Sequence, residues 1–328
     1  MNWYKFSTVI KIFLAGLFAI TGIANAVDLQ YPNKPIRMIV PFPPGGGADI
    51  IARTMSQKFT EAVSQQIIID NRAGAGGIIG LEIAAHAPPD GYTILLAPSG
   101  PMVIHPGLYK KLSYHTIRDF EPISLLISTP LILLVSPNLS VQTTRELIQY
   151  AARYPSKLNY ASVGKGGSSH LATELLMQMT GINMVHIAYK GLAPAISGFL
   201  GGEVQLMFGS AMASLPYIHS AKLRAIAVST VKRTAALPQL PTIAESGVPG
   251  YATGSWYGLL APVSVSTKVV NFLHLEFSKI IQNNEFKERL ISEGSDPVGS
   301  TPYEFKLHIR QELTRWASVI DRAQIKIE

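Results

Sequence analysis

Apolar runs of strand length alternate with segments of helical period along most of this chain. A short apolar run over 36–42 is followed by apolar residues at every fourth position, which place one stripe on a helix: Ile51, Met55, Phe59 and Val63. Further strands are predicted at 66–70 and 92–97, with a helix over 79–85 between them.

The same alternation resumes in the second half. Thr143 or Thr144 is expected to cap a helix over 145–154, and Ser168 or Ser169 a helix that reaches Met179. A strand is expected at 158–163, and buried strands at 184–188, 204–208 and 223–228. Further helices are expected over 267–282, 285–293 and 303–323. Such alternation predicts an α/β fold with mostly parallel sheets flanked by helices.

Two similar starts, each a strand, a glycine-rich loop and a helix, favour two lobes over one long sheet. The apolar segments 122–137 and 251–262 lie at the edges of the second series, and we expect them to cross between the lobes. Lobe I would then comprise 27–127 plus 253–328, and lobe II 128–252. Because ligands of open α/β sheets bind beyond the carboxyl ends of the strands, a ligand cleft is expected between the lobes.

The first 26 residues have the layout of a secretory signal peptide. Lys5 and Lys11 precede the apolar run 12–20, and the small-residue site Ala24-Asn25-Ala26 follows it. Cleavage after about Ala26 is therefore predicted, with export to an envelope compartment or out of the cell. The alternative is an uncleaved membrane anchor, for which the apolar run is short.

Composition removes several classes of protein. With 47% hydrophobic and 15% charged residues the chain is a packed globular protein, and without Cys it has no disulfides or thiolate metal sites. The formal charge of +7 falls to +5 (7 minus 2) once Lys5 and Lys11 are removed. The remaining basic residues form no stripe, so no nucleic-acid partner is expected.

Three glycine-rich loops carry the chemical information. The first, PFPPGGGADIIAR over 41–53, couples a strand end to a helix start, where free N–H groups and the helix dipole favour an anion. Asp49 is expected to have mainly a structural role, as a cap that pairs with Arg53.

The second loop, RAGAGGIIG over 72–80, misses the dinucleotide-binding glycine spacing by one residue, and no acidic residue follows at the required distance. A phosphate-binding loop of the nucleotide-hydrolase type is also absent from the sequence. We therefore expect no cofactor. The eight His residues are scattered in the sequence and predict no metal site.

The third loop, SVGKGGSSHLATE over 162–174, leaves a hydrolase hypothesis open. Ser168 or Ser169 with His170 would supply a nucleophile and a base. Adjacent helical residues face different directions and no G-x-S-x-G motif is present, so helix capping and ligand hydrogen bonding are favoured.

Ordered motifs along the chain resemble a known family. They are YPNKPIRMIVPFPPGGGADIIAR, IIIDNRAGAGGIIG, PPDGYTILLA, LNYASVGKGGSSHLATELL, VHIAYKGLAPAISGFLGGEV, LPTIAESGVPGY and WYGLLAP. In this order the chain resembles the Bug family, the TctC-like periplasmic solute-binding proteins of tripartite tricarboxylate transporters.

The resemblance implies a two-lobed type 2 periplasmic binding protein, a Venus flytrap that is not an enzyme. It would bind a small carboxylate as a monomer and deliver it to membrane permease subunits or, alternatively, to a sensor. Carried over by position, the first lobe contributes Phe42, Gly46, Gly47, Ala48, Asp49 and Ser99 to the ligand, and the second contributes Gly166, Ser168, Ser169, His170, Tyr189 and Gly191.

Some positions depart from the family pattern. Ala97, Pro98, Ser99 and Met102 form a less polar set than is usual near the third strand end, and Gln205 and Gly209 stand where many members have acids. Because a ligand ammonium would need carboxylate partners, these changes favour an aromatic or dicarboxylic acid over an amino acid.

Overall fold

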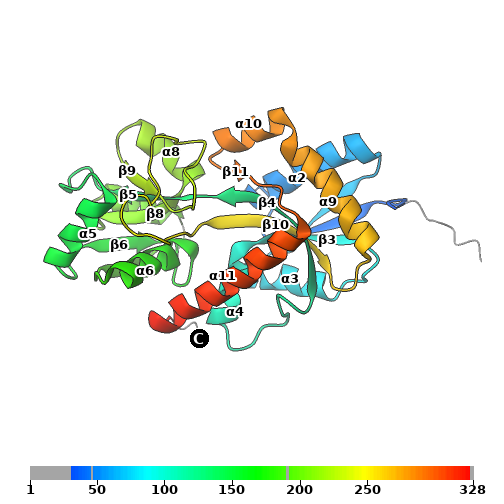
Figure 1. Ribbon diagram of the computed structural model, residues 1–328, viewed down its shortest axis with the longest axis horizontal. Helices are drawn as coiled ribbons and strands as arrows, with labels where there is room; N and C mark the ends of the chain where they lie inside the picture. The colour runs from blue at the N-terminus through cyan, green and yellow to red at the C-terminus, as the bar shows by residue number, and fades with distance from the viewer. Residues whose placement is uncertain (1–30, 46, 190–191, 326–328) are drawn as a thin grey trace, which may run out of the picture. The chain divides into compact units, whose positions relative to one another are not determined.

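The computed structural model describes residues 31–45, 47–189 and 192–325 (Figure 1). The elements below all belong to the unit formed by residues 34–328. The predicted signal peptide and its cleavage site lie outside the described residues. Within the described ranges, no helix has the length and apolar character needed to cross a membrane.

The first sheet has six strands in the order β11-β4-β10-β3-β1-β2. Its parallel part pairs β1 with β2 and β3, and its antiparallel part pairs β10 with β3 and β4, and β4 with β11. The bounds are β1 Ile36–Val40, β2 Ile67–Asn71, β3 Thr93–Pro98, β4 Phe120–Thr129, β10 Ser255–Pro262 and β11 Asp296–Pro297.

The second sheet has five strands in the order β7-β6-β8-β5-β9. Strand β6 is parallel to β7 and β8, whereas β5 is antiparallel to β8 and β9. The bounds are β5 Leu131–Val135, β6 Asn159–Ser162, β7 Val185–Ala188, β8 Leu206–Ser210 and β9 Arg224–Val228. Strand β7 lies at the edge and is largely exposed, so the expectation that it is buried was wrong.

Both sheets are mixed, which corrects the prediction of mostly parallel sheets. The strand–helix units pair in parallel as expected, but the strands next to the crossings between sheets run against them. Only Pro130 separates β4 in the first sheet from β5 in the second. Since the chain leaves one sheet along β4 and returns to it along β10, these strands pair antiparallel with each other.

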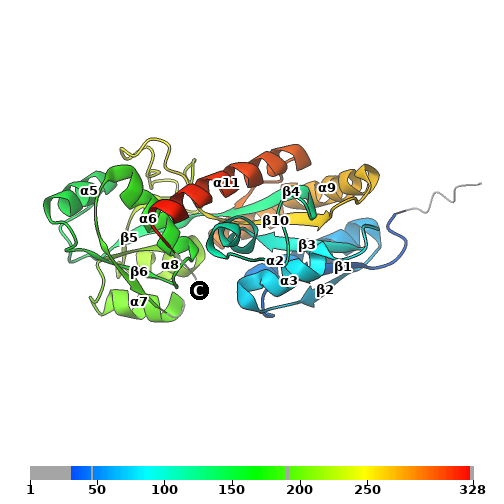
Figure 2. The same cartoon turned by 90° about the horizontal axis from the view of Figure 1, so that it is seen from below.

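Helices cover both faces of the first sheet. The predicted apolar stripe of α2 (Gly47–Val63) is buried at Ile51, Met55 and Phe59, and the Phe59 ring stacks 5.4 Å from that of Phe277 in α9 (Thr267–Gln282). In Figure 1, α2 and α9 lie on one side of the strands, and α3 (Ile78–Ala85) and α11 (Pro302–Arg322) on the other. Figure 2 shows α11 running along β10 and β4.

Side-chain caps fix the starts of two helices, α11 and α5. A capping box between Thr301 and Glu304 fixes the start of α11, and Thr143 caps α5, as predicted for one of the two threonines. The bounds are η1 Ala75–Gly77, η2 Gly100–Ile104, α4 His105–Leu108, α5 Thr144–Arg153, α6 Ser168–Thr180, α7 Leu192–Leu200, α8 Ala211–His219 and α10 Asn284–Ser292.

Candidate ligand-binding site

The loop between β1 and α2 is organised around the buried side chain of Asp49. Its Oδ2 accepts from Gly45 N and from Arg53 Nε, both at 2.9 Å, and its Oδ1 accepts from Asn71 Nδ2 at 3.0 Å. The Arg53 guanidinium, with help from the other two donors, lowers the pKa of Asp49 to about 2. The predicted pair with Arg53 is thus confirmed.

Asn71 joins this loop to the neighbouring strand. Its Nδ2 also donates to Phe42 O at 3.1 Å, so one amide holds both the end of β1 and the start of α2. Gly47 begins α2 and is half-buried, and Ala48 follows it, fully buried. The sequence had not singled out Asn71, although it ends an apolar run in the motif IIIDN, where side chains of a parallel strand reach the site edge.

Ser99 lies buried where β3 ends. Its Oγ is 3.4 Å from Ser255 Oγ and at the same distance from the backbone N of Trp256. Since β1 and β3 are parallel, Ser99 and the β1–α2 loop lie at the same edge of the first sheet.

The second glycine-rich loop is a spacer between the loops of this edge. A methyl group on Gly80 would lie 2.6 Å from Cβ of Pro41, and one on Gly77 would lie 2.9 Å from Cγ of Pro101. Gly77 also has φ +101°, a conformation that favours glycine. These glycines therefore let the loops after β1 and β3 approach each other.

In the second sheet, the loop after β6 turns through two glycines into α6. Gly164 and Gly166 have positive φ, and Gly167 is the N-cap, so the prediction that Ser168 or Ser169 caps α6 was wrong. Ser169 is buried, and its Oγ instead accepts from Val163 N at 3.1 Å. Ser168 is half-buried in the first turn, where backbone N–H groups have no partner within the helix.

His170 also holds the loop between β6 and α6. Its Nδ1 accepts from Gly166 N at 2.9 Å, which leaves the proton on Nε2, facing Glu174 Oε1 at 3.4 Å. Its ring stacks at 3.8 Å on His186, whose Nε2 lies 2.6 Å from Ser162 Oγ. Burial, with a smaller effect of His170, lowers the pKa of His186 to about 4.

Glu174 completes this buried cluster. It accepts from Tyr160 OH at 2.6 Å, and its hydrogen bonds to His170 and Tyr160 outweigh burial and lower its pKa. The sequence places Glu174 near the same helix start as His170, but it does not predict His186 or Tyr160 beside them. His186 and Tyr160 come from neighbouring parallel strands whose register, Tyr160 beside His186, the sequence does not reveal.

Tyr189 follows β7 at the same edge of the second sheet. Its backbone N donates to Ser162 O at 3.0 Å and its hydroxyl donates to Glu203 Oε2 at 2.8 Å. Gly46 and Gly191 lie outside the described residues. Among the predicted residues that the structure does describe, hydrogen bonds organise the first-sheet group and the second-sheet group separately, and none links the two.

Both groups present polar atoms suited to an anion. Two helix starts, of α2 and α6, offer backbone N–H donors, and the Asp49–Arg53 pair makes the first loop neutral. Within the described ranges, no cluster of His, Asp and Glu is arranged to hold a metal ion.

The geometry does not support a serine hydrolase. Nδ1 of His170 is occupied by Gly166 N and Nε2 faces Glu174, while Ser169 Oγ bonds Val163 N. Both ring nitrogens therefore have partners other than the neighbouring serines.

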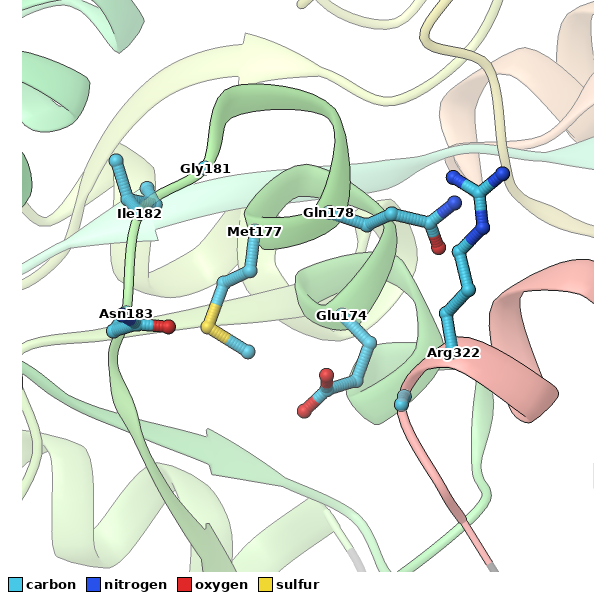
Figure 3. Close-up of a pocket in the computed structure, with 8 residues that line it drawn as sticks. Glu174, Met177, Gln178, Gly181, Ile182, Asn183 and Arg322 are labelled. Atoms are coloured by element: carbon cyan, nitrogen blue, oxygen red, sulfur yellow. The ribbon is translucent and has the colours of Figure 1, made fainter.

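A pocket of about 290 Å³ lies between α6 and the end of α11. Figure 3 shows Gln178 and Arg322 approaching each other at its rim, with the Glu174 carboxylate below them. Glu174 thus connects the buried cluster under the α6 loop to the surface.

Comparison with known proteins identifies close relatives. The model of the "Tripartite tricarboxylate transporter family receptor" matches residues 51–325. "Protein BugT" of Bordetella pertussis is 34% identical over 330 residues, covering 100% of both chains.

Two solved structures extend the comparison. An R. palustris protein solved with adipate is 34% identical, with a TM-score of 0.76, covering 90% of this chain and 100% of its own. MatC of Rhodopseudomonas palustris, with bound malate, is 28% identical, with a TM-score of 0.71, covering 88% and 100%. The predicted resemblance and the predicted fold class are confirmed, apart from the pairing direction corrected above. The chain belongs to the tripartite tricarboxylate transporter receptor family, whose members are periplasmic solute-binding proteins and not enzymes.

Proposed function

We propose that this protein captures a small carboxylate, preferentially an aromatic or dicarboxylic acid, and delivers it to the membrane permease subunits of a tripartite tricarboxylate transporter. The observation that carries the proposal is the pair of glycine-rich loops, each opening a helix at the carboxyl edge of its sheet. Two relatives solved with dicarboxylates, adipate and malate, support the ligand class.

The proposed site holds the anion by backbone N–H groups and small polar side chains from both sheets. It comprises the twelve residues predicted from the sequence, of which Gly46 and Gly191 lie outside the described residues. Ala97 and Met102 are buried and apolar beside Ser99, and Gln205 donates to Gly202 O. This environment offers a ligand ammonium few acidic partners, which supports an acid without an amino group.

The proposed lobes are 27–127 plus 253–328 and 128–252. The pairing of strands supports this division, because the first sheet takes its strands from residues 36–129 and 255–297, and the second from residues 131–228. In this proposal the ligand binds between the lobes and the protein is a monomer.

Calorimetric titration of the purified protein with adipate, malate and benzoate tests the function. We expect at least one acid to bind saturably, and ligand at 1,000 times Kd to raise the free energy of unfolding by about 4.1 kcal/mol. Absence of binding by all three acids would contradict the proposal.

Two variants test how the anion is held. Gly47→Pro removes one backbone donor at a helix position that tolerates proline, so the fold should persist. We expect it to weaken binding by about tenfold or more, since a hydrogen bond to a charged group contributes about 1.5–3 kcal/mol. Lys165→Ala is the matched control and should change affinity little, whereas the reverse order would show that side-chain charge dominates.

We also propose that export removes the first 26 residues. N-terminal sequencing of the protein recovered from the periplasm should begin near Val27, and an intact Met1 would favour the membrane-anchor alternative.

A further inference from the structure

A second, larger pocket lies away from the glycine-rich loops. Its volume is about 970 Å³, and it is bounded by the start of β10, by β11, by α11 and by the loop that follows β9. Apolar side chains form much of its wall, among them Leu125, Val231, Ile291 and Val298. None of the residues proposed for carboxylate capture lines this pocket.

Three buried polar atoms without a hydrogen-bond partner belong to side chains that line this pocket. They are Trp256 Nε1, Thr253 Oγ1 and His308 Nε2, three of six such atoms in the described part of the chain. Trp256 is 4% exposed and Thr253 is 7% exposed. Since an unpaired buried polar group costs about 1–3 kcal/mol, their gathering around one cavity points to an absent partner.

The packing around Trp256 fixes its ring. Phe305 meets it edge-on with ring centroids 5.4 Å apart, and His308 does so at 5.7 Å. The indole N–H can only donate, so its partner must be an acceptor.

The charged groups at the pocket also favour an acceptor. Both oxygens of Glu312 already accept, from Arg315 Nη1 at 2.7 Å and from Trp316 Nε1 at 3.0 Å. Asp296 Oδ1 accepts from Thr234 Oγ1 and from Ala235 N, each at 3.1 Å. Lys232 and Arg315 add cationic donors, which favour an anion. Because the Asp296 carboxylate repels negative charge, an occupant with one negative charge is favoured over one with two.

We propose that this pocket is a second ligand site, which binds a small organic monoanion through Trp256, Thr253 and Arg315 and receives its apolar body on the wall of Leu125 and Val298. The occupant is a monocarboxylic acid with an aromatic or aliphatic body. The pocket shares no lining residue with the proposed capture site, although Ser255 and Trp256 contact Ser99 of that site. The proposal does not rest on the capture site.

The test follows the indole N–H signals by nitrogen–proton NMR during titration with benzoate and hexanoate at constant ionic strength. Substitutions Trp256→Phe and Trp316→Phe assign the signals. We expect the Trp256 signal to shift saturably and the Trp316 signal to stay in place, because the Trp316 N–H already bonds Glu312. Trp256→Phe keeps the ring packing but should raise the Kd for benzoate at this site about tenfold, and Thr253→Val should act in the same direction.

The outcomes of these titrations either overturn the proposal or support it. A Trp256 signal that does not move, or that moves equally with sodium chloride, overturns it and leaves a pocket that holds only water. A Kd for benzoate, read from the Trp256 signal, that Thr253→Val leaves unchanged also overturns it. If Gly47→Pro abolishes adipate binding while the Trp256 response to benzoate persists, both sites stand. A Trp256 response without any adipate binding supports this pocket alone, and adipate binding without a Trp256 response supports the capture site alone.

Discussion

At the scale of single residues, buried polar side chains here bind the protein's own loops. Asp49 gathers Gly45, Arg53 and Asn71, and His170 holds Gly166 while stacking on His186. Each therefore fixes the backbone path of a glycine-rich loop that the proposed capture site uses.

Asp49→Asn should destabilise the fold by about 1–3 kcal/mol at neutral pH, because the new amide cannot accept from three donors. The pKa of Asp49 is about 2 when folded and 3.8 ordinarily, so its contribution is present above pH 3.8 and is lost as pH falls towards 2. Chemical denaturation at several pH values should show the difference between wild type and variant shrinking in that window. The exposed substitution Glu61→Gln is the control and should change stability little.

Protonation of His186 should oppose folding. Its pKa is about 4 in the folded protein and 6.5 ordinarily, so the unfolded chain binds the proton more readily and stability should fall as pH drops from 6.5 to 4. Half-buried His105, whose pKa is also lowered to about 4 by burial, adds to this slope. His186→Gln should therefore reduce proton uptake on unfolding by up to about one proton between these pH values. An unchanged slope would show that His186 is protonated equally in both states.

At the scale of elements, the amphipathic patterns were enough to place most helices and strands. Residues 267–282 form α9 as predicted, and the stripe of Ile51, Met55 and Phe59 is buried. The pattern did not reveal the direction in which strands pair or which side chains of neighbouring strands meet. Antiparallel pairing of β4 and β10 depends on how the chain returns, and Asn71 or His186 meets its partners only through strand pairing.

The same limit applies to helix starts. Ser168 and Ser169 satisfied the composition of a cap, but the chain turns through glycines until Gly167, so the serines begin one position too late. Local composition favours a cap within a few residues, whereas the backbone path of the loop decides which residue it is.

Gly80→Ala tests the spacer role of the second glycine-rich loop. Alanine favours helix by up to about 1 kcal/mol, but its methyl group would meet Pro41 Cβ at 2.6 Å and Cα at 2.8 Å. We expect overpacking to prevail, with a net loss of about 1–3 kcal/mol measured by chemical denaturation, and weaker ligand binding as Pro41 moves. Gly100→Ala, where a methyl group meets nothing within 4 Å, should leave stability nearly unchanged.

At the scale of the whole molecule, Ser229 connects the two crossings between sheets. Its buried hydroxyl accepts from Leu131 N at 3.0 Å, at the start of β5, and donates to Thr253 O at 2.8 Å, ahead of β10. Both crossings are thereby fixed to the end of β9.

Ser229→Ala should leave Leu131 N and Thr253 O without these bonds and lower the free energy of unfolding by about 1–3 kcal/mol. Hydrogen exchange should quicken at the Leu131 amide, which loses its acceptor, before it changes at the Thr253 amide, which still donates to Ser229 O. Ser220→Ala removes an exposed hydroxyl that bonds Pro216 O and serves as the control. Equal effects of the two substitutions would mean that Ser229 has no special place.

The origin of the strands in each sheet also sets an order of assembly. The second sheet is drawn from one continuous stretch, residues 131–228, whereas the first needs strands from both ends of the chain, residues 36–129 and 255–297. Pairings between distant segments pay a larger loop-closure entropy and form late. The second sheet can therefore form before β10 and β11 complete the first. A chain shortened at its C-terminus should retain the second sheet and lose the first.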